Sequence, residues 1–401
     1  MTLDDRLQAR LAAREAALLY RQRVTVASSC QVDQVAAGNP VVNFCSNDYL
    51  GLANHPQVKA AVKAAVDEAG FGSGASHLVS GHSVWHHTLE LALAELTQRP
   101  RALLFSTGYM ANMALVTGLL ENGQSVVGDK LNHASLVDAA QLACANKSKS
   151  SFLRYKHSDM ADLERQLKKT SAGTLVLTDG IFSMDGDIAP LPALAGLCHK
   201  YNAHLAVDDA HGFGCLGPDG GGSVLAAGLG VADVPVYMGT LGKAVGGFGA
   251  FIAGSEALIE ALIQFARPYI YTTALPPAVA AGNAASVALL RDEPSYRTRL
   301  QDNIAFFKQQ AKHHLALFEG VTLLPSDTAI QPLILGAEKR VMLVAEHLLR
   351  AGYWAGSIRP PTVPVGTARL RITLSAKHTQ QHIEGLWVAL AEALKVTEHD
   401  S

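Results

Sequence analysis

The side chains with the clearest chemical potential lie where predicted strands end and loops begin. Asp179, Asp208, His211 and Lys243 each follow an apolar run that is typical of a buried β-strand. The strands of an open α/β sheet present their carboxyl ends at one edge, so such a sheet would gather these groups into one cleft. The sequence therefore predicts a site that combines carboxylates, an imidazole and an amine.

Asp208 and His211 belong to the segment HLAVDDAHG, which runs from a predicted buried strand directly into polar residues. A carboxylate that emerges from a buried strand is costly unless it meets a cation or a hydrogen-bond donor. A protonated ring nitrogen would satisfy Asp208. On the residues alone, a helix cap or a structural hydrogen bond is an equally good interpretation.

Lys243 lies in the segment YMGTLGKAVGGFG, where small residues leave its amine approachable and no sequence neighbour is an acid. A lysine in such a site can lose its proton and act as a nucleophile. A P-loop would need glycine and Ser or Thr at the positions of Tyr237 and Ala244, so that interpretation fails. Thr240 and Lys243 imitate a Ser-x-x-Lys hydrolase pair, but its companion segments S-D-N and K-T-G are missing.

The segment FSTGYMAN predicts a turn from a strand into a helix, where backbone N–H groups at Gly108 and Tyr109 could bind a phosphate. By itself, this pattern also fits an ordinary capped helix. His133 in LNHASL precedes another predicted helix, and the residues alone leave open whether it has any chemical role.

Three further histidines stand close together in the segment GHSVWHH. His82 and His86 have the i, i+4 spacing of two metal ligands, with His87 beside them. No acidic or cysteine ligand stands at a matching spacing. We therefore expect no metal site.

The elements that position these groups follow from the hydrophobic pattern. From about residue 101 onward, short apolar runs alternate with helical patterns, as in RALLF before ANMALVTGLL and GTLVLTD before LPALAGLCHKY. This alternation predicts βαβ units around a mostly parallel sheet sandwiched by helices. We expect an N-terminal arm over residues 1–45, a large α/β domain over 46–290 and a smaller C-terminal α+β domain over 291–401.

The composition limits the possible partners. The 401 residues are 49% hydrophobic and carry a net charge of −2, so the chain can bury a large core but has no basic field for nucleic acid. The uncharged stretches 102–120 and 268–290 contain polar residues or prolines, so we expect core rather than membrane spans. The expected partner is therefore a small molecule.

The cysteines and the N-terminal residues suggest a location. Five cysteines without a C-x-x-C pair argue against disulfides and zinc, and favour the reducing cytoplasm. The N-terminal segment carries acidic residues and lacks the apolar core of a signal peptide. It places Leu3, Leu7, Leu11 and Leu18 on one helical face, so we expect an arm that packs against another surface.

Taken together, these segments resemble the α-oxoamine synthase family of pyridoxal-phosphate (PLP) enzymes, which have the fold of type I PLP-dependent transferases. The resemblance covers nearly the whole chain. It rests on the segments NFCSNDYLGL, GSGASHLVSGHSVWH, FSMDGD, DDAHG, GTLGK, IQPLI and IRPPTVPVGTARLRIT.

The resemblance implies a role for each matching residue. Lys243 would attach PLP and act as a base, Asp208 would pair with the pyridinium nitrogen, and His133 would stack on the ring. The remaining implied contacts are His211 and Ser183 at the ring hydroxyl, and Gly108, Tyr109, Thr240 and, from a second subunit, Thr272 or Thr273 at the phosphate.

Within the family, the segments are most similar to members that condense L-alanine with a pimeloyl thioester, an acyltransferase reaction. Asn47 and Arg371 would hold the amino-acid carboxylate, and Arg21 and Thr362 the acyl partner, with Arg359 nearby. A guanidinium suits this task because it grips a carboxylate bidentately. Coenzyme A and an acyl carrier protein both remain open as the thiol carrier, and the resemblance implies a homodimer.

One position departs from the family pattern. Asp179 stands where the family has Glu in T-E-G, and we leave it out of the predicted site. Relatives that use glycine, such as glycine C-acetyltransferase and 5-aminolevulinate synthase, usually lack the segments IRPPTVPVG and GHSVWH.

Two other classes of protein fit the sequence less well. A Rossmann oxidoreductase needs G-x-G-x-x-G after its first strand, whereas GGFGAF follows the lysine loop and precedes a strand. A non-catalytic scaffold would have no need of the four residues Lys243, Asp208, His211 and His133, all of which are present.

Overall fold

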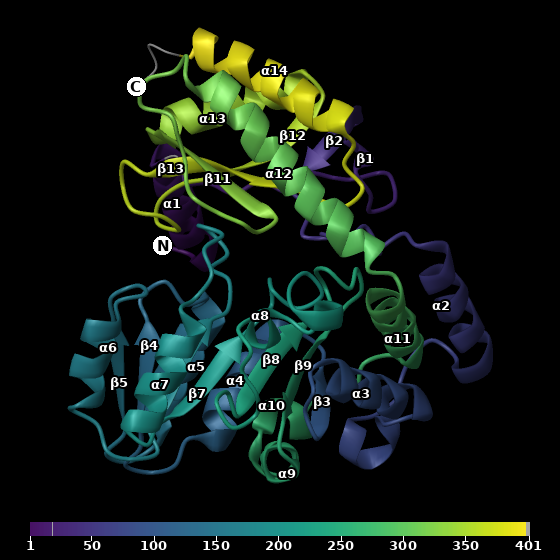
Figure 1. The fold of residues 1–401 in the computed structure, drawn as a ribbon, viewed down its shortest axis with the longest axis vertical. Helices are drawn as coiled ribbons and strands as arrows, with labels where there is room; N and C mark the ends of the chain where they lie inside the picture. The colour runs from purple at the N-terminus through teal and green to yellow at the C-terminus, as the bar shows by residue number, and fades with distance from the viewer. Residues whose placement is uncertain (18, 398–401) are drawn as a thin grey trace.

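The computed structural model describes residues 1–17 and 19–397 and contains two sheets, one above the other in Figure 1. Leu18 of the predicted leucine face and residues 398–401 of the predicted C-terminal domain lie outside the described residues.

The larger sheet has seven strands in the order β3-β9-β8-β7-β6-β4-β5. Its central strands pair in parallel, and only β9 runs antiparallel to both of its neighbours. The predicted mostly parallel α/β sheet is therefore confirmed. The strands are β3 (Arg101–Phe105), β4 (Ser125–Asp129), β5 (Ser151–Tyr155), β6 (Leu175–Asp179), β7 (His204–Asp208), β8 (Val236–Thr240) and β9 (Ala250–Gly254).

Helices cover both faces of this sheet, because alternate side chains of each strand enter different cores. Leu103 and Phe105 of β3 pack in one core, and Leu104 between them packs in the other. One face carries α4 (Gly108–Leu119), α5 (Ala134–Asn146), α9 (Glu256–Phe265) and α10 (Arg267–Ile270). The other carries α3 (Val84–Leu96), α6 (Met160–Leu167), α7 (Leu191–Lys200), α8 (Ser223–Ala226) and α11 (Pro277–Asp292), against which α2 (Pro56–Ala69) packs.

The second sheet has the order β1-β2-β12-β13-β11-β10. Figure 1 shows helices α12 (Ser295–Leu315), α13 (Glu338–Arg350) and α14 (Gln380–Val396) on its outer side. Its buried residues, such as Leu370, belong to the same hydrophobic cluster as Leu205 and Val207 of the large sheet. The strands are β1 (Asp33–Ala36), β2 (Asn39–Phe44), β10 (Thr322–Leu323), β11 (Ile330–Gly336), β12 (Tyr353–Ile358) and β13 (Ala368–Thr373).

Strands β1 and β2 come from the segment predicted as an arm, and β2 pairs in parallel with β12. The N-terminal segment therefore supplies part of the C-terminal sheet. The predicted domain boundaries at residues 45 and 290 stay a prediction.

Helix α1 (Leu3–Ala16) begins with a capping box formed by Thr2 and Asp5. None of its residues is buried, and Leu3, Leu7 and Leu11 are 62%, 42% and 48% exposed. The described part of this chain therefore does not supply the surface that we expected this helix to pack against.

No helix among the described residues is long and apolar enough to cross a membrane. The uncharged stretches 102–120 and 268–290 form parts of β3, α4, α10 and α11. The five cysteines are all free.

Candidate active site

The parallel strands β6, β7 and β8 end side by side at one edge of the large sheet. This edge faces the C-terminal sheet. In the registers of β6, β7 and β8, Asp179 is the neighbour of Asp208, and Asp208 is the neighbour of Met238. A cavity of about 220 Å³ opens at these strand ends. The predicted site residues in its lining are Gly108, Tyr109, His133, Ser183, Asp208, His211, Thr240 and Lys243.

Asp208 is a buried carboxylate, only 6% exposed, whose hydrogen-bond partners in the described chain are neutral amides. Its Oδ2 accepts from Asn112 Nδ2 at 2.7 Å, and its Oδ1 accepts from the backbone N–H of Ala210 at 3.0 Å. A buried carboxylate is stabilised when a cation meets it. The site therefore suits a ligand with a protonated ring nitrogen.

The next residue, Asp209, makes structural hydrogen bonds. This is the alternative role that the sequence left open for Asp208. It accepts from the backbone N–H and the hydroxyl of Ser223 at 2.6 Å each, and from the Tyr237 hydroxyl at 2.9 Å. Successive side chains of an extended strand point to opposite faces, so only Asp208 reaches the cavity.

Lys243 and His211 form a hydrogen-bonded pair, with 3.0 Å between Lys243 Nζ and His211 Nε2. Burial lowers the pKa of His211 well below its usual value, and the charges of Lys243 and Arg371 lower it further. Burial also lowers the pKa of Lys243 to about 8, although the carboxylates of Asp208 and Asp179 oppose this shift. His211 is therefore a neutral acceptor beside an amine that loses its proton near neutral pH.

The first turn of α4 and the end of β8 form another part of the lining. Thr107 caps this helix by accepting from the backbone N–H of Met110 at 3.2 Å. A Cβ at Gly108 would come within 2.9 Å of Thr240 Cγ2, so only glycine allows this close approach. The open N–H groups of a first helical turn suit an anion, as predicted for a phosphate at Gly108 and Tyr109.

A chain of hydrogen bonds connects Asp208 to His133. The Asn112 amide donates both to Asp208 and to Ser135 Oγ, the latter at 2.9 Å. Ser135 Oγ lies 2.7 Å from His133 Nδ1, which also accepts from the backbone N–H of Ser135 at 3.3 Å. Because Nδ1 accepts, a neutral His133 ring carries its proton on Nε2.

Three polar residues of the lining, Asn112, Ser135 and Asp179, were not in the predicted site. Asp179 was set aside because it departs from the family pattern, yet its carboxylate accepts from the backbone N–H of His133 at 3.2–3.3 Å. Burial and the charge of Asp208 raise its pKa well above the usual range. Its position at the end of a predicted strand was the signal that could have kept Asp179 in the predicted site. Ser135 stands two residues after His133, but Asn112 offered no such signal.

Arg371 and Asn47 lie next to this lining rather than in it. Arg371 donates from Nε to the Ser183 carbonyl at 2.6 Å and from Nη1 to Asn47 Oδ1 at 3.2 Å and Thr373 Oγ1 at 3.1 Å. Nη2 takes part in none of these three bonds. The guanidinium is therefore held in place with one nitrogen left to donate.

Arg21 and Thr362, predicted for the acyl partner, line a second cavity of about 480 Å³ together with Arg359. This cavity is formed by residues 19–22 and 357–362, with Arg14 of α1 at its rim. Arginines from two distant segments of the chain therefore line the same cavity.

Thr272 and Thr273 do not line the Lys243 cavity of their own chain. Thr273 instead forms an isolated β-bridge with Ser76, and Ser73 donates to the carbonyl of Ala274 at 2.5 Å. This placement leaves their predicted role in a second subunit untested.

The histidines of GHSVWHH lie apart from this site. One ligand atom each of His82, His87 and Glu90 lies within 4.8 Å of the others. Sequence analysis missed Glu90, one turn along α3 from His87. Zinc bonds of about 2 Å bring tetrahedral ligand atoms to roughly 3.4 Å from one another, so we assign no metal to this wider cluster.

The residues of the first cavity fit PLP. Asp208 has only amides as hydrogen-bond donors in the described chain, the first turn of α4 offers N–H groups, and Lys243 stands in the same lining. These are the three interactions that a protonated pyridine, a phosphate and an aldehyde require.

Comparison with known proteins supports this assignment. Residues 39–390 match the family Aminotransferase class I and II. The chain is 54% identical to the 8-amino-7-oxononanoate synthase of Pseudomonas paraeruginosa over 96% of this chain and 94% of that protein. It is 53% identical to the enzyme of the same name from Stutzerimonas stutzeri, over 98% and 97%.

Solved structures of PLP-dependent enzymes are also similar to this chain. The serine palmitoyltransferase of Sphingomonas wittichii matches with a TM-score of 0.91 and 31% identity over 99% of each chain. A high-resolution structure of SPT with PLP matches with a TM-score of 0.91 and 29% identity, over 99% of this chain and 100% of that one. The 8-amino-7-oxononanoate synthase of Francisella tularensis matches with a TM-score of 0.76 and 30% identity, over 89% and 99%. The chain therefore belongs to the class I and II aminotransferase family of PLP-dependent enzymes and, within it, to the 8-amino-7-oxononanoate synthases.

Proposed function

We propose that this enzyme condenses L-alanine with a pimeloyl thioester to give 8-amino-7-oxononanoate, carbon dioxide and the free thiol carrier, a step of biotin biosynthesis. A carbon–carbon bond forms between Cα of alanine and the acyl carbonyl carbon, while the bonds to sulfur and to the carboxylate break. The observation that carries the proposal is the buried Asp208 carboxylate, paired only with amides and facing the same cavity as Lys243.

Lys243, Asp208 and the first turn of α4 would hold the cofactor, with His133 against its ring and Ser183 and His211 at its hydroxyl. Bound there, PLP supplies an electron sink for the negative charge that develops on Cα of the substrate. Asp208 favours the protonated ring nitrogen, because a buried carboxylate gains most from a cation beside it. Asn112 and Ala210 hold that carboxylate in place.

Lys243 removes the proton from Cα of alanine. An ordinary lysine has a pKa of about 10.4 and is almost fully protonated at pH 7. Burial lowers the pKa of Lys243 to about 8, which makes the free amine available. The neutral His211 at 3.0 Å accepts a hydrogen bond from Nζ and so orients it.

His133 donates a hydrogen bond to the acyl carbonyl. Since its Nδ1 accepts from Ser135, the Nε2 proton is the one available to the cavity. A donor aimed at an oxygen that gains negative charge lowers the barrier to attack. Asn112 and Ser135 act through His133, by fixing its tautomer.

Arg371 binds the carboxylate of alanine through Nη2, beside Asn47. Its other nitrogens are already bonded to Ser183, Asn47 and Thr373, so the donor is oriented before the substrate arrives. Arg21 and Thr362, with Arg359 nearby, bind the acyl partner in the second cavity.

The active unit is a homodimer in which Thr272 or Thr273 completes the phosphate site of the other subunit. Large apolar side chains are exposed around this segment, as a subunit interface requires. Phe71, Val79, Val84 and Tyr271 are 87%, 79%, 69% and 70% exposed, and the Ser76–Thr273 bridge brings their two segments together. The free cysteines suit the cytoplasm.

The test is a product assay on the holoenzyme with pimeloyl-CoA and, in parallel, pimeloyl-acyl carrier protein. We expect free thiol, carbon dioxide and the amino ketone with L-alanine, and no product from Lys243→Ala. Lys63→Ala, which changes an exposed lysine of α2, serves as the matched control. Turnover with glycine but not with alanine would overturn the proposed substrate.

A further inference from the structure

A hairpin connects the two sheets beside the active site. After β6 the chain turns back on itself, with Ile181 bridged to Ile188 and the Phe182 N–H donating to the Asp187 carbonyl at 3.0 Å. We call residues 181–188 the FSMDGD hairpin. Ser183 of this hairpin lines the cavity, and its carbonyl accepts from Arg371.

The tip of the FSMDGD hairpin is fixed to the C-terminal sheet. The Gly186 carbonyl accepts from the hydroxyls of Ser326 and Thr328 at 3.0 Å each. Asp185 forms an ion pair with Arg369 of β13. The base of the hairpin continues directly from β6 of the large sheet, where the Gly180 N–H donates to the Asp208 carbonyl at 2.7 Å.

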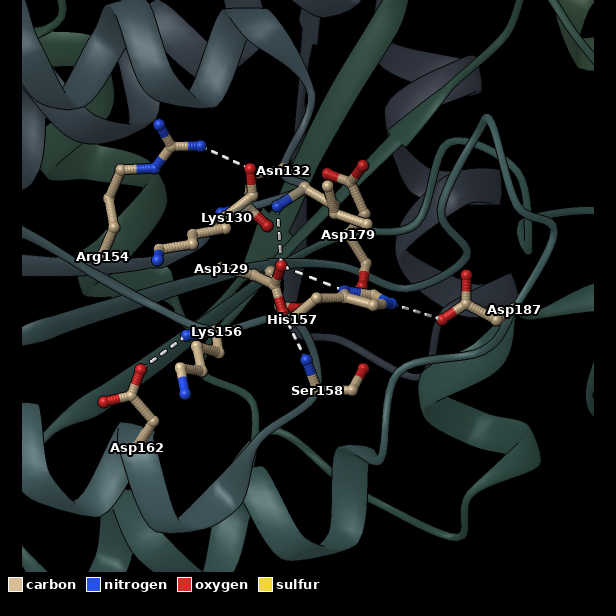
Figure 2. Close-up of polar contacts among 12 residues, drawn as sticks. Asp129, Lys130, Asn132, Arg154, Lys156, His157, Ser158, Asp162, Asp179 and Asp187 are labelled. Atoms are coloured by element: carbon tan, nitrogen blue, oxygen red, sulfur yellow. Dashed lines mark hydrogen bonds and ion pairs between the residues drawn. The ribbon is translucent and has the colours of Figure 1, made fainter. Parts of the chain in front are cut away.

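One imidazole connects that base to two neighbouring segments of the large domain. His157, in the turn after β5, lies with Nδ1 3.1 Å from Asp129 Oδ1 and Nε2 2.9 Å from Asp187 Oδ2, as Figure 2 shows. Asp129 ends β4, and Asp187 belongs to the hairpin. The ring also meets Phe182 edge to face, with 4.4 Å between the ring centres. His157 therefore ties three separate segments together.

Only the doubly protonated ring can donate to both carboxylates. Asp129 is 1% exposed and has two backbone donors besides His157, from Leu131 at 2.8 Å and Ser158 at 2.9 Å. Burial opposes a charge on His157, but the hydrogen bonds and charges of Asp129 and Asp187 raise its pKa to about 10. The imidazolium thus persists throughout the neutral range.

We propose that His157 is a positioning residue for this reaction: by joining Asp129 to Asp187 it fixes the FSMDGD hairpin, and through the Ser183 carbonyl it holds Arg371 for the amino-acid carboxylate. The inference deepens the proposed function and rests on it. His157 itself is absent from the lining of the Lys243 cavity, so it acts through the hairpin.

The contacts predict a specific kinetic signature. Loss of the two contacts of His157 should misplace Arg371, which binds alanine, more than Lys243, which stands on another loop. Since small displacements of a positioning group can cost large factors in rate or binding, we expect His157→Gln to raise the KM for alanine about tenfold. We expect kcat to fall by no more than about threefold, because Lys243, which removes the Cα proton, stays in place.

The experiment compares wild type, His157→Gln and the double variant His157→Gln/Asp187→Asn, all as holoenzymes. Kinetics with varied alanine are measured beside the absorbance change that alanine causes in the bound cofactor. The double variant removes the carboxylate left unpaired at the hairpin and should recover part of the alanine affinity. His199→Gln is the matched control, because His199 also faces a carboxylate, Asp233 at 3.7 Å, but lies away from the hairpin.

An unchanged KM for alanine in His157→Gln would overturn the positioning role. So would equal losses of kcat, alanine affinity and bound cofactor, with no recovery in the double variant, because that pattern describes general structural damage. The proposed function fails separately, if the wild type itself does not turn over alanine.

Discussion

At the scale of single residues, the site depends on polar groups that orient the side chains facing the cavity. Ser135 is the clearest case, because its backbone N–H donates to His133 Nδ1 and its hydroxyl relays the hydrogen bond from Asn112. The chain Asp208–Asn112–Ser135–His133 therefore links the residue at the ring nitrogen to the residue at the acyl carbonyl.

Ser135→Ala should lower kcat about tenfold or more while leaving cofactor affinity unchanged, because His133 loses the hydroxyl that orients it. Steady-state kinetics and cofactor titration of the variant measure this. Ser286→Ala is a matched control, since Ser286 is fully buried and its Oγ has no partner. A kcat equal to that of Ser286→Ala would show that the relay has no catalytic importance.

The lowered pKa of Lys243 predicts the pH dependence of cofactor attachment. Only the neutral amine reacts with an aldehyde, and its fraction rises as pH passes through the pKa. With a pKa of about 8, the rate at which the apoprotein takes up PLP should rise through pH 8 and level off above pH 9. Stopped-flow absorbance measures this rate, and a rise that continues to pH 10 or above would contradict the assignment.

At the scale of elements, strands and helices fix where these residues meet. The strands predicted before Asp179, Asp208 and Lys243 are present as β6, β7 and β8. Sequence analysis did not predict β5, whose residues Ser151, Phe152, Leu153 and Arg154 are not buried. An edge strand lacks the continuous apolar run of a central parallel strand, so its pattern is weak.

For the site as well, the sequence predicts the residues that lie in recognisable local segments but not those whose role depends on contacts across the fold. Lys243, Asp208 and His133 carry recognisable local segments, and the structure places all three in one cavity. Asn112 and Ser135 owe their importance to contacts across 96 and 23 residues of sequence. No local pattern reports such contacts, because they arise only when the sheet brings α4, α5 and β7 together.

His157 predicts a pH-dependent contribution to stability. Its pKa is about 10 in the folded state and 6.5 without partners, so the folded form retains a proton that the unfolded form loses. The stabilisation is complete below pH 6.5 and declines as pH rises toward 10. The charged groups that face His157 are Asp129 and Asp187.

Thermal unfolding of wild type and His157→Gln from pH 6 to 10 tests this. The difference in Tm should be largest at pH 6 and should shrink steadily toward pH 10. A difference that stays constant, or grows with pH, would mean that His157 is neutral in the folded protein.

At the scale of the whole molecule, the proposed shared site requires two chains per functional unit. The exposed leucines of α1 and the apolar side chains around Thr273 are left exposed to solvent by the described chain. Thr272 and Thr273 also stand outside the cavity of their own chain.

Remixing of inactive variants tests the shared site. Lys243→Ala and Thr272→Ala/Thr273→Ala should each have little activity, because each lacks one part of every site. After the subunits are exchanged, half of the random dimers contain one intact site, so about a quarter of wild-type activity should return. Lys243→Ala remixed with itself is the control. No recovery, or full activity of the threonine variant alone, would contradict a shared site.

The central claim is that Lys243 removes the Cα proton of L-alanine at this site. The most direct measurement is the exchange of that proton for deuterium, followed by NMR in D2O with the holoenzyme and no acyl donor. We predict exchange by wild type and by Lys63→Ala, and none by Lys243→Ala. Exchange at the wild-type rate in Lys243→Ala, or exchange of glycine protons but not of the alanine proton, would contradict the account.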